Sequence, residues 1–142
     1  MTSLQTLKST MGRMTGDEKH SPSALSTLNV LWTLYDRVRH IDPDSPDNPE
    51  RDRFVLSKGH GPMAYYAILA AKGFFPDAWL DTCGQFDSPL GQHPDRNLIP
   101  GVEVSSGSLG HGLPIGVGIA LALASKGRSS ARTSPRVFVL VG

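Results

Sequence analysis

Residues 136–142 (RVFVLVG) limit the possible folds more than any other segment of this chain. After Arg136 the run is continuous in β-branched and apolar side chains, without the polar alternation of a strand that faces water on one side. Such runs are typical of strands covered on both faces, as in parallel sheets flanked by helices. The run therefore predicts a central strand in an α/β domain.

Helical patterns alternate with β-prone runs over the rest of the chain. Apolar side chains recur at helical spacing over 22–40, where Ser21 is the expected N-cap and Pro22 occupies the first helical position. In chain order we expect helix 22–40, strand 53–57, helix 62–72, a short helix 76–83, an extended piece 102–106, helix 113–126 and strand 136–142. Strands separated by helices predict a parallel sheet.

Glycines mark the expected ends of two helices, and one of these helices is unusually apolar. Gly73 is expected to end helix 62–72, and Gly127 to end helix 113–126. The latter (LPIGVGIALALASK) carries no charge before Lys126. A helix this apolar is expected to be buried over most of its surface.

Composition and charge exclude several classes of protein. Of the 142 residues, 39% are hydrophobic and 19% charged, which excludes disorder of the whole chain. We expect a polar N-terminal segment over 1–20 and one folded unit over 21–142. The net charge of +1 provides no basic field for nucleic acid or an acidic membrane. The single cysteine, Cys83, allows no intramolecular disulfide, and no transmembrane or signal segment is recognised, so a cytoplasmic location is expected.

The segment 105–112 (SSGSLGHG) carries the strongest chemical signal in the sequence. Its glycines expose backbone N–H groups, and a helix is expected to follow directly. This combination is suited to holding a phosphate or diphosphate. The spacing matches neither the dinucleotide-binding G-x-G-x-x-G pattern nor a P-loop. From the pattern alone, a Gly-rich turn without a ligand fits equally well.

The five histidines are a second chemical signal. His20, His60, His93 and His111 lie at expected turns beside Gly, Ser or Pro, where loops over a rigid sheet build binding sites. His40 ends the first long helix and is interpreted as structural. Any one of these histidines alone fits a surface or hydrogen-bonded side chain better than a functional one.

Three ordered motifs together carry a resemblance to a known family. They are 53–61 (RFVLSKGHG), 91–95 (GQHPD) and 100–112 (PGVEVSSGSLGHG). The chain resembles transketolase from about His20 to Gly142, most closely the N-terminal subunit of the split, two-gene form. The resemblance implies a thiamine diphosphate enzyme that moves a two-carbon ketol unit between sugar phosphates, with an α/β diphosphate-binding domain.

The resemblance also implies roles for individual residues. His60 would contact the cofactor near its diphosphate, and His20 and His93 would face the substrate. Main-chain contacts to the cofactor would come from Gly107, Ser108 and Leu109. No residue of the chain is assigned as catalytic or as a metal ligand, and His111 receives no role. The family usually has His-Pro-Gly-Gly where this chain has residues 20–23 (HSPS).

The metal site of the family begins with a Gly-Asp-Gly motif just after a strand like 137–141. Gly142 would be the first glycine of that motif, so the Mg²⁺ ligands are expected beyond residue 142 and the fold is expected to be incomplete at the C-terminus. Completion would require the rest of the domain and a transketolase C-terminal subunit or downstream domains, in a homo- or hetero-oligomer. The isolated chain is then expected to bind the cofactor weakly and not to turn over. The alternative is a non-catalytic remnant or assembly protein of the same fold.

Overall fold

The structure is a computed structural model that describes residues 2–15, 20–125 and 134–142. Two parallel strands, β1 (Arg53–Leu56) and β2 (Val137–Leu140), pair in register from Arg53 opposite Val137 to Leu56 opposite Leu140. The helices are α1 (Leu4–Met11), α2 (Ser21–Thr33), α3 (Met63–Ala71) and α4 (Gly112–Ser125). A π-helical turn, η2 (Leu34–Val38), continues α2, and a 3₁₀ helix, η3 (Asp77–Thr82), follows α3. This confirms the predicted α/β class with a parallel sheet.

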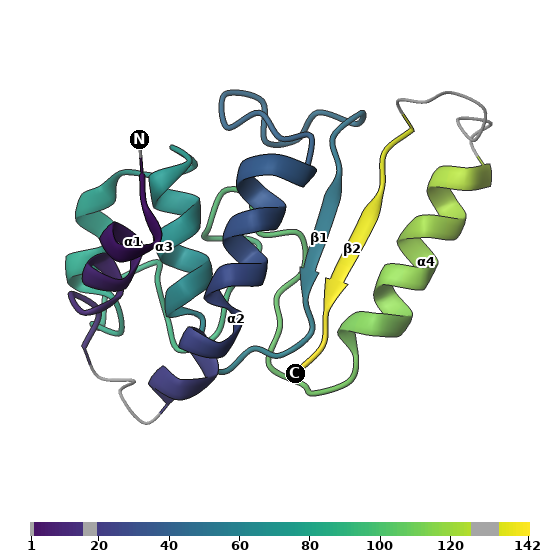
Figure 1. Ribbon diagram of the computed structural model, residues 1–142. Coiled ribbons are helices and arrows are strands. Elements are labelled where there is room, and N and C mark those ends of the chain that lie inside the picture. Colours follow the sequence, from purple (N-terminus) through teal and green to yellow (C-terminus); the bar gives the residue numbers. More distant parts are fainter. Residues whose placement is uncertain (1, 16–19, 126–133) are drawn as a thin grey trace.

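The helices divide unevenly between the two sides of the sheet. Figure 1 shows α1, α2 and α3 gathered on the β1 side, whereas α4 lies alone beside β2. The main hydrophobic core lies on the three-helix side, where α3 is buried along its length from Met63 to Leu69. Phe54 of β1 packs edge-on against Tyr35 and Tyr65 in the same core.

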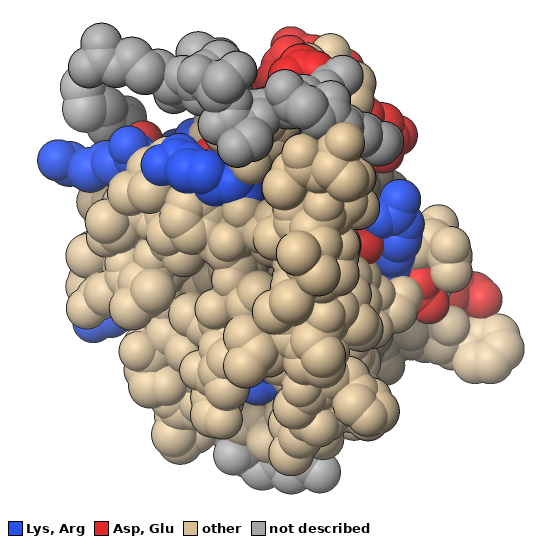
Figure 2. Space-filling model, turned by 90° about the vertical axis from the view of Figure 1, so that its right-hand side faces the viewer, with Lys and Arg blue, Asp and Glu red and all other residues tan. Residues whose placement is uncertain are grey.

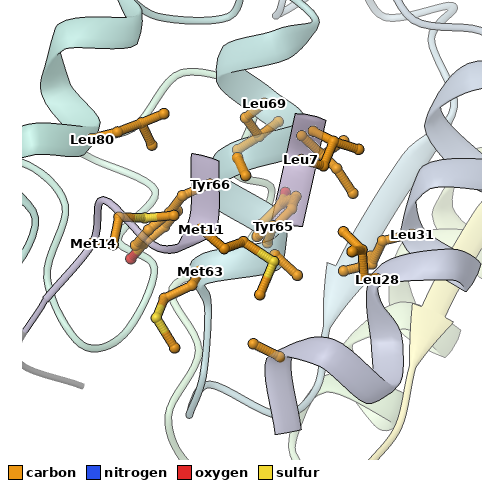
Figure 3. Packing of buried hydrophobic residues seen from close by; sticks show 14 of the residues in the cluster. Leu7, Met11, Met14, Leu28, Leu31, Met63, Tyr65, Tyr66, Leu69 and Leu80 are labelled. Atoms are coloured by element: carbon orange, nitrogen blue, oxygen red, sulfur yellow. The ribbon is translucent and has the colours of Figure 1, made fainter. Parts of the chain in front are cut away.

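Helix α1 belongs to this core, although the sequence predicts a polar segment over residues 1–20. Its buried side chains Leu7 and Met11, together with Met14 beyond its end, belong to the same hydrophobic cluster as residues of α2 and α3 (Figure 3). On the surface, the Arg13 guanidinium pairs with the carboxylates of Asp77 and Asp81 at 2.6 and 2.7 Å. The N-terminal segment is therefore docked by both apolar and ionic contacts.

The short helix expected over 76–83 is present as a 3₁₀ helix, closed by bonds such as Trp79 N–H to the Pro76 carbonyl. Two other local predictions need correction. Ser21 is not the N-cap of α2, because it is already helical and His20 occupies the cap without a side-chain capping bond. No strand forms over 102–106, where Ser106 N–H donates to the carbonyl of Pro94 in the neighbouring loop. Gly73 ends α3 with a φ of +87°, as predicted.

The largest departure from expectation is α4. Only Gly112 and Gly116 are buried, whereas Leu113, Val117 and Leu121 are 51, 53 and 67% exposed. Figure 2 shows this side of the molecule, and Lys, Arg, Asp and Glu are largely absent from it. The prediction that most of α4 is buried is wrong for this chain, because two strands cover only a narrow stripe of the helix. The expected end at Gly127 lies outside the described residues.

Strand β2 is likewise only partly covered. All four of its residues are half-buried, so the two-sided cover predicted from its sequence is not found among the described residues. Within the same part of the chain, no helix combines the length and the apolar character needed to cross a membrane.

Candidate functional site

The candidate site lies at the edge of the sheet where both parallel strands end. Residues 57–60 continue β1 into the turn before α3, and Gly142 lies two residues after β2. The two ends touch, since a Cβ on Gly142 would lie 2.7 Å from Cδ of Lys58. In open α/β sheets ligands bind beyond the carboxyl ends of the strands, so this edge is where a ligand is expected.

Three of the histidines singled out in the sequence meet at this edge. The ring centroids of His20 and His60 are 5.0 Å apart, and those of His60 and His93 are 4.6 Å apart. Each ring comes from a different element: the start of α2, the turn after β1, and the loop between η3 and α4. Residues far apart in the sequence thus form one histidine cluster, defined here as His20, His60 and His93.

Gly107 belongs to the same site through a close backbone approach. A Cβ on Gly59 would lie 2.6 Å from Cα of Gly107 and 2.7 Å from Cδ2 of His93. A Cβ on Gly107 would lie 3.2 Å from the same His93 atom. Any side chain at Gly59 would therefore displace the imidazole or the Gly-rich turn, which explains glycine at this position.

A small polar network holds the His93 loop against the Gly-rich turn. The Ser105 hydroxyl donates to Asp95 Oδ1 at 3.1 Å, and Arg96 N–H donates to Ser105 Oγ at 2.9 Å. Ser106 N–H donates to the Pro94 carbonyl at 3.2 Å. Sequence reasoning did not assign Ser105 to the site. No local pattern marks its bond to Asp95, which joins two separate segments.

The first turn of α4 completes the edge, where two serine hydroxyls lack a hydrogen-bond partner among the described residues. Gly112 begins the helix, and a Cβ there would lie 2.7 Å from Oγ of Ser57. Oγ of Ser57 and Oγ of Ser106 are buried and have no hydrogen-bond partner among the described residues. The first N–H groups of a helix also lack intrahelical partners and favour an anion. Ser108 and Leu109 are exposed in the Gly-rich segment that precedes α4.

Lys58 is a further residue of the edge that sequence reasoning missed. It is 8% exposed, and its ammonium donates to the carbonyl and to Oγ of Ser23 in the first turn of α2, at 2.5 and 2.6 Å. Burial lowers the pKa of the Lys58 ammonium below its ordinary value. No ion pair joins it to a carboxylate among the described residues.

The remaining candidates lie elsewhere or are not enclosed. His40 lies before β1, at the opposite end of the sheet, where its backbone N–H donates to Asp52. His111 is exposed beside α4, and Cys83 is half-buried after η3. The described ranges contain no group of three or more His, Cys, Asp or Glu side chains arranged to hold a metal ion.

A parallel sheet with a Gly-rich turn, a helix start and histidines at its carboxyl edge defines a class of domain that binds phosphorylated cofactors. The particular family follows from a match of residues 14–138 to the family model described as transketolase, thiamine diphosphate binding domain. The chain belongs to the transketolase family, as its motifs predicted.

Individual relatives agree with this assignment. The chain is 58% identical over 136 residues to a protein of Rhodococcoides fascians named ferredoxin fas2, and 43% identical over 123 residues to an apulose-4-phosphate transketolase subunit of Actinobacillus succinogenes. These matches cover 96 and 87% of the chain but 43% of each relative, so the chain spans about two fifths of their length. The solved transketolase of Leishmania mexicana matches all of the chain and 23% of its own length, with 26% identity and a TM-score of 0.78.

Proposed function

We propose that this chain is the thiamine diphosphate-binding part of a split transketolase that transfers a two-carbon ketol unit between sugar phosphates. The observation that carries the proposal is the meeting of His20, His60 and His93 with Gly107 at the carboxyl edge of the strands. Residues 21–142 then form the front part of the diphosphate-binding domain. Two relatives that are single subunits of split transketolases are named for apulose 4-phosphate and for 6-deoxy-6-sulfo-D-fructose, which supports a sugar as the substrate.

The residues at this edge carry the types of hydrogen-bonding group that bind a diphosphate. The buried hydroxyl of Ser57 lacks a partner among the described residues, and the first N–H groups of α4, which begins at Gly112, have no intrahelical partners. In the proposed site, His60 binds near the diphosphate, and the backbone at Gly107, Ser108 and Leu109 contacts the cofactor. When bound, the cofactor supplies a nucleophilic carbon that carries the two-carbon unit.

The histidines farther along the edge are proposed to face the sugar. His93 lines the path to the cofactor, and His20 reaches it from the start of α2. Imidazoles donate and accept hydrogen bonds near neutral pH, so both side chains suit the hydroxyl groups of a ketose or aldose. Their task in this proposal is to orient the substrate, and none of the residues of the chain is proposed as the catalytic base.

The proposal requires groups that residues 1–142 do not supply. We propose that Mg²⁺ ligands lie beyond residue 142 and that a transketolase C-terminal subunit or downstream domains contribute the aminopyrimidine-binding part. The working protein is then a homo- or hetero-oligomer, and we expect it in the cytoplasm. The chain alone is expected to bind the cofactor weakly, because a diphosphate without its cation meets few opposite charges here.

The name of the ferredoxin relative does not transfer to this chain. A ferredoxin-type iron–sulfur cluster is held by four cysteine thiolates. Residues 1–142 contain only Cys83, and the match leaves more than half of that relative uncovered. The similarity therefore concerns the part that both proteins share with transketolases.

The proposal is tested by reconstitution with the partner. The protein containing this chain is captured from its source, the co-purifying polypeptides are identified by mass spectrometry, and the complex is rebuilt with thiamine diphosphate and Mg²⁺. We expect transfer from a ketose phosphate to an aldose, followed by liquid chromatography and mass spectrometry. His60→Asn is expected to weaken cofactor binding about tenfold, the effect of one lost hydrogen bond of ordinary strength.

Two further variants make the assay specific. His93→Asn is expected to lower kcat/KM for the sugar at least about tenfold, because it removes a group that orients the substrate. His40→Asn is the matched control and is expected to leave both values unchanged, since His40 lies at the opposite end of the sheet. A rebuilt complex that binds no cofactor and transfers no ketol unit would instead support the non-catalytic assembly protein.

A further inference from the structure

Lys58 connects the turn that carries His60 to the helix that carries His20. It precedes His60 by two residues, and its ammonium donates to the Ser23 carbonyl and to Ser23 Oγ at 2.5 and 2.6 Å. Ser23 lies in the first turn of α2, three residues after His20. The bonds between Lys58 and Ser23 therefore tie the first turn of α2, which begins after His20, to the turn that carries His60.

The backbone at Gly61 provides the second contact between these segments. Gly61 has a φ of +67°, and a Cβ there would lie 2.9 Å from the His20 carbonyl and 3.3 Å from Cβ of Ser23. This contact lets the helix approach closely. The N-cap of α2 at His20 has no side-chain capping bond. The bonds from Lys58 to Ser23 add directional contacts to this close approach.

The energetics argue that these bonds act on geometry more than on stability. Lys58 is 8% exposed, and no carboxylate of the described residues pairs with it. Taking an ammonium out of water without a counter-charge is costly, and an apolar side chain of similar length would avoid that cost. A buried lysine in this place contributes directional bonds at a cost in desolvation.

We propose that Lys58 is a positioning residue that holds His20 beside His60 through its hydrogen bonds to Ser23. The proposal rests on the proposed function for the significance of the histidine pair, but its geometric content does not depend on a bound cofactor. Lys58 itself touches no reacting atom in this proposal. Lys58 acts on the position of His20 indirectly, by holding the first turn of α2.

The test measures the two ring-to-ring contacts separately by NMR. The chain of residues 1–142 is labelled with ¹³C-histidine, and nuclear Overhauser effects (NOEs) between the rings are recorded for Lys58→Met and for the control Lys72→Met. Lys72 pairs with Asp36 at 2.7 Å at the far end of α3, away from the cluster. Because the NOE falls with the sixth power of distance, a shift of about 1 Å, enough to impair a positioned group, lowers it roughly threefold.

We expect Lys58→Met to lower the His20–His60 NOE by at least about threefold and to leave the His60–His93 NOE unchanged, with a melting temperature equal to or above that of the parent chain. A purely structural lysine would instead lower both NOEs and the melting temperature together. An unchanged His20–His60 NOE in Lys58→Met overturns the proposal.

A second variant keeps the proposal falsifiable if Lys58→Met does not fold. Ser23→Ala removes one of the two acceptors and is expected to lower the His20–His60 NOE about twofold, a smaller displacement than the full loss. An unchanged NOE in a folded Ser23→Ala variant overturns the proposal. Neither result bears on cofactor binding, so failure of the reconstitution experiment and failure of this one are distinguishable.

Discussion

Helices α3 and α4 are built from nearly the same kinds of residue but have opposite surroundings. α3 (MAYYAILAA) is buried at every position from Met63 to Leu69, with α1 and α2 packed against it. α4 (GLPIGVGIALALAS) touches β1 and β2 and is buried only at Gly112 and Gly116. The comparison teaches that an apolar helix sequence predicts surface that other elements should bury. Whether it is buried depends on neighbouring segments, which the sequence of the helix alone does not specify.

The largest expected effect separates the two helices by a matched substitution. Leu69→Ala removes a side chain with no exposed area from the three-helix core and is expected to cost about 2–5 kcal/mol of unfolding free energy. Leu121→Ala on α4, where the leucine is 67% exposed, is expected to change it by less than about 0.5 kcal/mol. Urea unfolding followed by circular dichroism measures both. Equal losses would contradict the contrast between the helices.

The second prediction concerns the hydrogen bonds and the ion pair that join the segments before β1 and β2. Asp52, which precedes β1, accepts bonds from the backbone and guanidinium of Arg136, before β2, and from His40 N–H. Burial opposes ionisation of this carboxyl, but the bonds from Arg136 and His40 outweigh it and hold its pKa below the ordinary 3.8. Asp52→Asn is expected to cost about 1–3 kcal/mol at neutral pH.

The pH dependence of this loss has a definite sign. The folded carboxylate binds a proton less readily than the unfolded one, so its contribution is fully present above the ordinary pKa and is lost as the pH falls through the lower folded value. The stabilities of the parent chain and of Asp52→Asn are therefore expected to converge as the pH falls through the folded pKa of Asp52, which lies below 3.8. Unfolding curves between about pH 2 and 7 test this, and a difference that persists at the acid end would refute the assignment.

The smallest effects come from two glycines on α4 that have different neighbours. A Cβ on Gly116 would lie 2.4 Å from Cγ2 of Val139, whereas nothing lies within 4 Å of a Cβ on Gly118. Gly116→Ala is expected to destabilise the chain by about 1–2 kcal/mol, because the stiff valine cannot withdraw from the new methyl group. Gly118→Ala is expected to stabilise it by about 0.5–1 kcal/mol through helix propensity. Thermal unfolding measures both, and stabilisation by both would show that α4 does not pack on β2 as described.

Sequence reasoning predicted the parallel sheet and most helices because these depend on local patterns. The apolar run at 136–142 and the alternation of helices with strands were sufficient for the α/β class. Helix α1 was underestimated because Ser, Thr and Lys are prominent in its composition. Its core contacts still follow a helical spacing, at Leu7, Met11 and Met14, and that spacing was the available signal.

The sequence predicted which residues meet at the candidate site but not the hydrogen bonds that hold their segments in place. His20, His60, His93 and Gly107 came from motifs, and the structure brings all four to one edge. The roles assigned to them stay predictions. The bonds of Lys58 to Ser23 and of Ser105 to Asp95 join residues of ordinary type across different segments, and no local pattern marks such contacts.

The register of β1 with β2 also bears on the order in which the molecule assembles. Residues 57–136 separate the two strands, whereas α1, α2, β1 and α3 are near neighbours along the chain. Contacts between distant residues form late, because a long loop must close before they can stabilise anything. The three-helix side can therefore condense while the chain is still being synthesised, and β2 joins only after the ribosome has released the far side of that loop. Within residues 1–142, the pairing of β2 with β1 is thus expected to follow the formation of the three-helix side.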